Sequence, residues 1–237
     1  MDFNVQVEIW SDVVCPWCYI GKRQFEEALA AFPHRQDVTV EWRSYELDPT
    51  APARREGTMV ELLQKKYSMS ADQAIAANAR VTGIAAGVGL DYRLDQAVMG
   101  NTFNAHRLIH LAASRGLGDA MKERLMAGYF TEGAAIGDTD TLEVLAVEVG
   151  LDADEVRQVL SDDTFADEVR RDEQQAQALG VSGVPFFVID RAYGISGAQP
   201  PDVILGALQR AWDDGHPDAD EDPAAAGPSC DGDVCAV

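Results

Sequence analysis

The chain has 237 residues and carries 40 acidic against 19 basic side chains, a formal net charge of −21 with a pI near 4.3. Such a surface repels phosphate backbones and anionic membranes, so we expect no nucleic-acid or membrane partner. No uninterrupted apolar run reaches ~18 residues, and the N-terminus lacks the apolar segment of a secretory signal. We therefore expect a cytoplasmic protein, and the composition leaves monomer and homodimer equally open.

The first elements predicted are a strand, a helix and a second strand. Residues 5–10 alternate between apolar and polar, which indicates a strand. Apolar spacing then becomes helical over residues 19–31, and Pro33 ends that helix. Residues 38–42 alternate again. This order predicts a parallel strand pair joined by a helical crossover.

The middle of the chain has helical patterns only, which predicts a helical module. The pair Ser70 and Gln73 has the form of a capping box, a typical helix start. The expected helices cover residues 59–67, 71–86, 95–115, 119–131, 141–149, 154–161 and 165–179.

Strand patterns return near the end, at residues 184–190 and 193–197, and a last helix is predicted over residues 202–213. The fold class predicted is α/β, with a sheet domain interrupted by helices. We assign residues 1–55 plus 180–214 to the sheet domain and 56–179 to the helical insertion. Residues 215–237 have the acidic, Ala-, Gly- and Pro-rich composition of a flexible tail.

Thiol chemistry is predicted at Cys15-Pro16-Trp17-Cys18, between the first strand and the first helix. Unpaired N–H groups and the helix dipole at a helix start favour the thiolate of Cys15, which is the attacking form of a cysteine. Cys18 follows about one turn later and can resolve a mixed disulfide by attacking Cys15. Pro16 suits an early helical position because its missing N–H needs no partner there.

The second predicted site element is Val184-Pro185, at the start of an apolar strand. A trans proline at a strand start is the ordinary explanation. Because of the cysteine pair, we expect instead a cis Val184–Pro185 bond whose neighbouring backbone groups pair with an extended substrate.

Three segments together carry a resemblance to a known family: WSDVVCPWCYIG at residues 10–21, NTFNAHR at 101–107 and GVSGVPFF at 180–187. They resemble the FrnE-like branch of DsbA-related thiol–disulfide oxidoreductases. The resemblance implies a thioredoxin fold with an inserted helical domain, with Cys15, Cys18 and Pro185 as catalytic residues. It also implies protein or small-molecule disulfides and dithiols as partners, glutathione among them, and no cofactor, because the disulfide itself carries the electrons.

Two other classes share parts of this pattern. Kappa-class glutathione transferases and hydroxychromene-carboxylate isomerases are similar in architecture but generally lack the second cysteine, which favours redox chemistry here. A zinc-binding module could use Cys15, Cys18, Cys230 and Cys235 as four ligands. The strand-to-helix context of the first pair favours the redox motif, so we expect no metal site.

Asn101, Asn104 and His106 lie in a predicted helix of the insertion. One interpretation is a polar wall that faces the cysteines and binds substrate, and the other is hydrogen bonding between domains. Carboxylates of the sheet domain are candidates for proton transfer to Cys18, although we expect them to be exposed strand residues: Glu8, Glu41 and Glu46.

The terminal pair, Cys230 and Cys235, encloses four residues that include Gly232. The 15 residues from Gly215 to Ser229 span about 20 Å as a flexible chain and about 50 Å when extended. This reach suggests an auxiliary redox pair that exchanges disulfides with Cys15 and Cys18. Extra C-terminal cysteines also occur in some FrnE-like proteins, which supports the hypothesis by resemblance.

Overall fold

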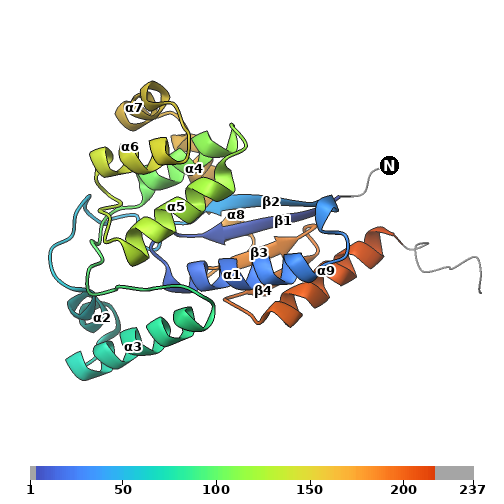
Figure 1. Cartoon of the computed structure of the whole chain (residues 1–237), viewed down its shortest axis with the longest axis horizontal. Coiled ribbons are helices and arrows are strands. Elements are labelled where there is room, and N and C mark those ends of the chain that lie inside the picture. Colours follow the sequence, from blue (N-terminus) through green and yellow to red (C-terminus); the bar gives the residue numbers. More distant parts are fainter. Residues whose placement is uncertain (1–3, 217–237) are drawn as a thin grey trace, which may run out of the picture.

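A computed structural model describes residues 4–216 of the chain. Its centre is a mixed sheet of four strands in the order β2-β1-β3-β4 (Figure 1). The strands are β1 (Val5–Ser11), β2 (Val38–Ser44), β3 (Phe186–Ile189) and β4 (Tyr193–Ser196). β1 and β2 are parallel, as predicted, whereas β3 is antiparallel to both β1 and β4.

Two helices cover one face of this sheet, α1 (Pro16–Ala31) and α9 (Pro201–Gly215), and they lie side by side in Figure 1. A 3₁₀ turn, Arg35–Asp37, leads into β2. The insertion supplies α2 (Met59–Tyr67), α3 (Ala71–Gly87), α4 (Phe103–Ala113), α5 (Gly118–Thr131), α6 (Thr139–Glu148), α7 (Ala153–Ser161) and α8 (Ala166–Ala178). The predicted thioredoxin-like fold with a helical insertion is therefore confirmed. None of the helices within residues 4–216 is long and apolar enough to cross a membrane.

The helix predicted over residues 95–115 is wrong in its first part, because α4 begins only at Phe103. Residues before it pack against the 52–55 loop, where the N–H of Asn101 donates to the carbonyl of Pro52 over 2.9 Å. A Cβ on Gly100 would lie 2.2 Å from the carbonyl oxygen of Ala53, so only glycine permits this approach. Tertiary hydrogen bonds thus replace helical ones in this stretch.

Both faces of the sheet are buried, which the alternating pattern of β1 alone does not indicate. Val7 and Ile9 face the α1 and α9 side, while Trp10 packs on the other face against Ala176 of α8. The indole N–H of Trp10 donates to the carbonyl of Asp172 over 2.8 Å. The insertion therefore folds back over the sheet and covers the face opposite α1.

The expectation that Glu8 is an exposed strand residue is wrong, because its side chain is 1 % exposed. Arg43 pairs with one Glu8 carboxylate oxygen over 2.6 Å, and Arg191 contacts the same carboxylate. Arg43 also reaches Asp172 of α8 at 3.2 Å. Burial of Glu8 is thus compensated by two guanidinium groups, and this cluster joins the sheet to the insertion.

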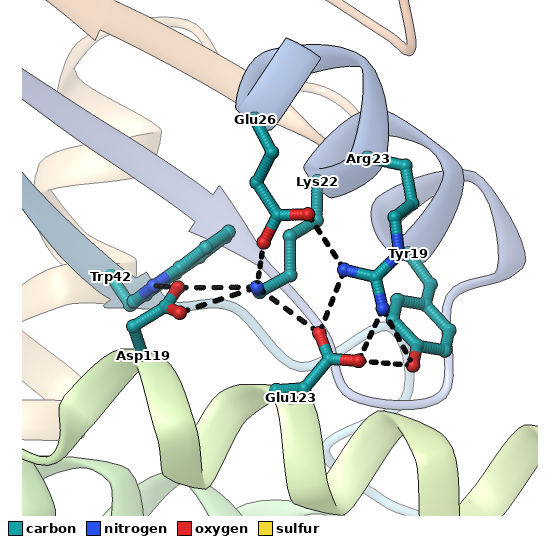
Figure 2. Close-up of polar contacts among 7 residues, drawn as sticks. All are labelled: Tyr19, Lys22, Arg23, Glu26, Trp42, Asp119 and Glu123. Carbon is teal, nitrogen blue, oxygen red and sulfur yellow. Dashed lines mark hydrogen bonds and ion pairs between the residues drawn. The ribbon is translucent and has the colours of Figure 1, made fainter. Parts of the chain in front are cut away.

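Helix α1 is held to α5 by the charged cluster in Figure 2. The buried ammonium of Lys22 lies among the carboxylates of Glu26, Asp119 and Glu123, with oxygens of the last two at 3.3 and 3.1 Å. The hydroxyl of Tyr19 donates to Glu123 over 2.6 Å. These contacts fix the insertion against the helix that carries both cysteines.

Candidate active site

Cys15 is the N-cap of α1, and Pro16 is the first residue within the helix. The N–H of Cys18 donates to the carbonyl of Cys15 over 3.0 Å, which starts the helix one residue after the nucleophile position. Both cysteines are free thiols and buried, whereas Trp17 between them is 41 % exposed. The motif thus presents an aromatic surface to solvent and keeps its sulfurs inside.

The Val184–Pro185 bond is cis and lies against this motif. The Cys15 thiol donates to the carbonyl of Val184 at an Sγ–O distance of 3.5 Å, across 169 residues of sequence. Gly21 of α1 faces the Pro185 ring, because a Cβ at Gly21 would lie 2.9 Å from Pro185 Cγ. Among the hydrogen bonds of the described residues, none uses the backbone N–H of Val184.

Cys18 lies beneath Cys15 in a fully buried position. Burial raises the pKa of the Cys18 thiol well above its usual range, and the neighbouring Cys15 raises it further. Two features lower the pKa of Cys18 in turn, the positive charge of Lys122 and the backbone N–H of Asp12. The ionisation of Cys18 therefore depends on groups from both the sheet domain and the insertion.

Lys122 enters this site from α5 and is entirely buried. Its ammonium donates to the carbonyl of Ser11, the last residue of β1, over 2.9 Å. Burial lowers the pKa of Lys122 to about 8, while the charges of Cys18, Asp12 and Cys15 partly oppose that effect. The sequence carries one signal of this burial, because Lys122 shares the apolar face of its helix with Leu125 and Met126.

Asp12 joins His106 of α4 to the loop before the cysteines. The His106 Nε2 atom lies 3.3 Å from one Asp12 carboxylate oxygen, and the N–H of Leu47 donates to the other over 2.8 Å. Burial raises the pKa of Asp12, but the His106 contact, the Leu47 hydrogen bond and the Lys122 charge outweigh it, so the pKa is lowered. His106 is thus buried behind the active-site loop.

Asn101 and Asn104 make contacts of the kind expected for hydrogen bonding within and between domains. Asn101 donates to Glu46 over 3.3 Å, and Asn104 accepts from Arg107 over 2.9 Å. The Glu46 side chain is buried and paired with Arg170 at 2.6 Å, so the expectation of an exposed glutamate is wrong here too. Hydrogen bonds among the described residues join neither asparagine to a cysteine.

Tyr92, which sequence reasoning missed, closes the insertion over the first turn of α1. Its hydroxyl donates to the carbonyl of Pro16 over 2.7 Å, and its ring stacks on Phe130 with centroids 4.4 Å apart. Burial raises the pKa of Tyr92, and the charges of Cys15 and Cys18 add to this. No local pattern marks this residue, because its contacts come from distant segments.

The two remaining cysteines, Cys230 and Cys235, lie outside the described residues, so their predicted role stays a prediction. Within residues 4–216, no group of three or more His, Cys, Asp or Glu side chains is arranged to hold a metal ion. The zinc alternative needs all four cysteines and is therefore untested.

Known proteins are similar to this chain in both fold and sequence. Residues 6–209 match the DSBA-like thioredoxin domain. The chain belongs to this family. Within the DSBA-like family, a probable DsbA oxidoreductase from Streptomyces coelicolor is similar, with 50 % identity and a TM-score of 0.85 over 88 % of this chain and 90 % of that one.

Two further proteins extend the comparison of this DSBA-like chain. The uncharacterised protein YwbO of Bacillus subtilis is 31 % identical over 86 % of this chain and 96 % of its own length. The cytosolic disulfide reductase DsbM of Pseudomonas aeruginosa has the same fold, with a TM-score of 0.61 and 19 % identity over 87 % of this chain and 98 % of that one.

Proposed function

We propose that this chain is a thiol–disulfide oxidoreductase in which Cys15 is the nucleophile and Cys18 the resolving thiol. One observation carries the proposal: the Cys15 sulfur lies at the start of α1 and against the carbonyl of Val184, beside Pro185. A helix start stabilises a thiolate, and the sulfur that must attack later is held one turn away, in the interior.

The reaction takes place in two exchanges of the same kind. The Cys15 thiolate attacks one sulfur of a substrate disulfide, the substrate S–S bond breaks, and one substrate thiolate leaves. Cys18 then attacks Cys15, the mixed disulfide breaks, and the second substrate thiolate leaves. The substrate gains two electrons, and the enzyme becomes the Cys15–Cys18 disulfide; with a dithiol substrate the same steps run in reverse.

Substrate binding is assigned to the exposed rim of the motif. The N–H of Val184 has no partner among the described residues and can donate to an extended substrate segment, as in strand addition. Trp17 offers an apolar surface next to Pro16. One of the similar structures, DsbM, was solved with glutathione, so glutathione disulfide is the first small substrate to test.

The finer assignment to the FrnE-like branch rests on the three sequence segments, and the tail relay is proposed with it. Cys230 and Cys235 are assigned as an auxiliary pair that passes electrons to or from Cys15 and Cys18. Replacing both tail cysteines with serine is expected to change turnover or the redox potential of the active pair. An unchanged turnover and potential would contradict the relay but leave the main proposal intact.

The main proposal is tested by reduction of insulin and of glutathione disulfide with three variants. We expect Cys15→Ser to abolish both activities. We expect Cys18→Ser to accumulate a mixed disulfide on Cys15, detectable by mass. The tail variant also loses two cysteines, but we expect it to retain both activities, at a changed rate if the relay operates. Glutathione conjugation that survives Cys18→Ser, without disulfide reduction by the wild type, would identify a transferase instead.

A further inference from the structure

Lys122 is a buried cation without the carboxylate partner that such a group usually has. Its side chain is fully inaccessible, and its hydrogen bond goes to the carbonyl of Ser11. Among the described residues it forms no salt bridge, whereas Lys22, buried nearby on α1, has three carboxylates around it. An ammonium buried without an ion pair opposes folding, because burial removes its hydration. Such a cost calls for a functional explanation.

The position of Lys122 relative to one peptide group supplies that explanation. The carbonyl of Ser11 and the N–H of Asp12 belong to the same peptide unit. Lys122 donates to that carbonyl over 2.9 Å. The charge of Lys122 and the N–H at the other end of this peptide both lower the pKa of Cys18. A cation on the carbonyl polarises the peptide and strengthens the N–H as a donor, since hydrogen bonds in a chain reinforce one another.

We propose that Lys122 is a positioning residue for Cys18, whose ammonium stabilises the Cys18 thiolate through the Ser11–Asp12 peptide and through its own charge while the mixed disulfide is resolved. This inference rests on the proposed function. The Cys18 thiolate attacks the Cys15 sulfur, the Cys15–substrate bond breaks, and the Cys15–Cys18 disulfide forms. The proton lost by the Cys18 thiol ends on the released substrate thiol, so no further reactant is needed.

Other charged groups around Lys122 fit this assignment. The charges of Cys18, Asp12 and Cys15 raise the pKa of Lys122. The charge of Lys22, from α1, lowers it. Asp12 is already engaged by His106 and by the N–H of Leu47. Cys18 changes charge in the proposed reaction, and no carboxylate or histidine side chain is among the groups that shift its pKa.

The test uses a chromogenic aryl disulfide, dithiobis(nitrobenzoate), mixed with the reduced full-length protein in a stopped-flow instrument. Every protein in this test, the wild type included, also carries Cys230→Ser and Cys235→Ser, so that only Cys15 and Cys18 release nitrothiobenzoate. The first released nitrothiobenzoate reports attack by Cys15, and the second reports resolution by Cys18. In Lys122→Met we expect the first phase to be unchanged. The second phase should slow about tenfold at pH 7 for each unit by which the pKa of Cys18 rises. The pH midpoint of the second phase should move upward.

A second variant, Lys122→Gln, separates charge from hydrogen bonding, because glutamine keeps an N–H donor but is neutral. We expect it to slow the second phase as the methionine does. If the glutamine variant resolves at the wild-type rate, or if neither variant changes the pH midpoint, the proposal is wrong. Lys22→Met is the matched control, since it removes a buried lysine of the same region that has no contact with the Ser11–Asp12 peptide; its second phase should keep its rate.

The outcome also separates the two proposals. A wild-type protein without a second phase, or a second phase that survives Cys18→Ser, would overturn the proposed function itself. A wild-type protein with both phases and an unaffected Lys122→Met variant would overturn only the role of Lys122.

Discussion

The thiol of Cys15 donates to the carbonyl of Val184 at 3.5 Å, so the candidate nucleophile is held against the residue that precedes the cis proline. The contact joins the start of α1 to the loop before β3. Its geometry depends on how closely these two segments approach, and that approach is set by Gly21, where a side chain would meet the Pro185 ring.

We therefore expect Gly21→Ala to destabilise the protein and to impair disulfide reduction. The new Cβ would lie 2.9 Å from Pro185 Cγ, and overpacking of this kind costs about 1–3 kcal/mol. The better helix propensity of alanine offsets up to ~1 kcal/mol of this loss. Urea unfolding of the reduced protein and insulin turnover are the measurements.

Gly83→Ala on α3 is the control for the glycine substitution, because a Cβ there has no heavy atom within 4 Å. It should leave activity unchanged and raise stability by up to ~1 kcal/mol. Equal stabilities of wild type and Gly21→Ala would contradict a close contact between α1 and Pro185.

Asp12→Asn is expected to destabilise the protein in a pH-dependent way. The pKa of Asp12 is lowered below 3.8, so its carboxylate stabilises the folded state above that value and loses this effect as the pH falls through the folded-state pKa. At pH 7 the variant should lose about 1–3 kcal/mol of unfolding free energy. The difference from wild type should shrink below pH 3.8. A difference that is constant from pH 7 to pH 3 would contradict the Asp12–His106 interaction.

Glu123→Gln tests the cluster of Figure 2 that joins α5 to α1. Glutamine keeps the shape but removes the charge that faces Lys22 and Arg23, so we expect a loss of about 1–2 kcal/mol. The pKa of Glu123 is lowered, and this contribution should therefore vanish as the pH falls below 4.5.

Glu148→Gln is the control for this cluster, because Glu148 pairs with Arg124 on the exposed surface at 2.7 Å. Such pairs contribute about 0–1 kcal/mol. Similar losses for both glutamine variants, measured by urea unfolding, would mean that the buried ammonium of Lys22 does not depend on Glu123.

The lowered pKa of Lys122 predicts a stability that rises with pH, as for the two carboxylates, but in an alkaline window. Its pKa is about 8 in the folded protein against 10.5 in an exposed lysine, so folding expels a proton between these values. Wild-type stability should rise with pH through this window relative to Lys122→Met, by about 3 kcal/mol in total. Parallel unfolding free energies of the two proteins from pH 7.5 to 10.5 would contradict the lowered pKa of Lys122 in the folded state.

Features that depend on residues close together in the chain were predictable from the sequence. The alternation of residues 5–10 and 38–42 predicted the two parallel strands, and Cys15 and Cys18 were placed correctly at the start of a helix. The cis bond at Pro185 was also predicted, from its combination with the cysteine pair. These features follow from periodicity, from proline chemistry and from spacing within one turn.

Which side chains meet at the site depends instead on how distant segments pack together. The contacts of Lys122 with Ser11, His106 with Asp12 and Tyr92 with Pro16 join segments 76 to 111 residues apart. They exist because the insertion packs across the end of the sheet, and no local pattern encodes the angle of that packing. For the same reason a lysine on an apolar helix face was visible in the sequence, but the peptide group it contacts was not.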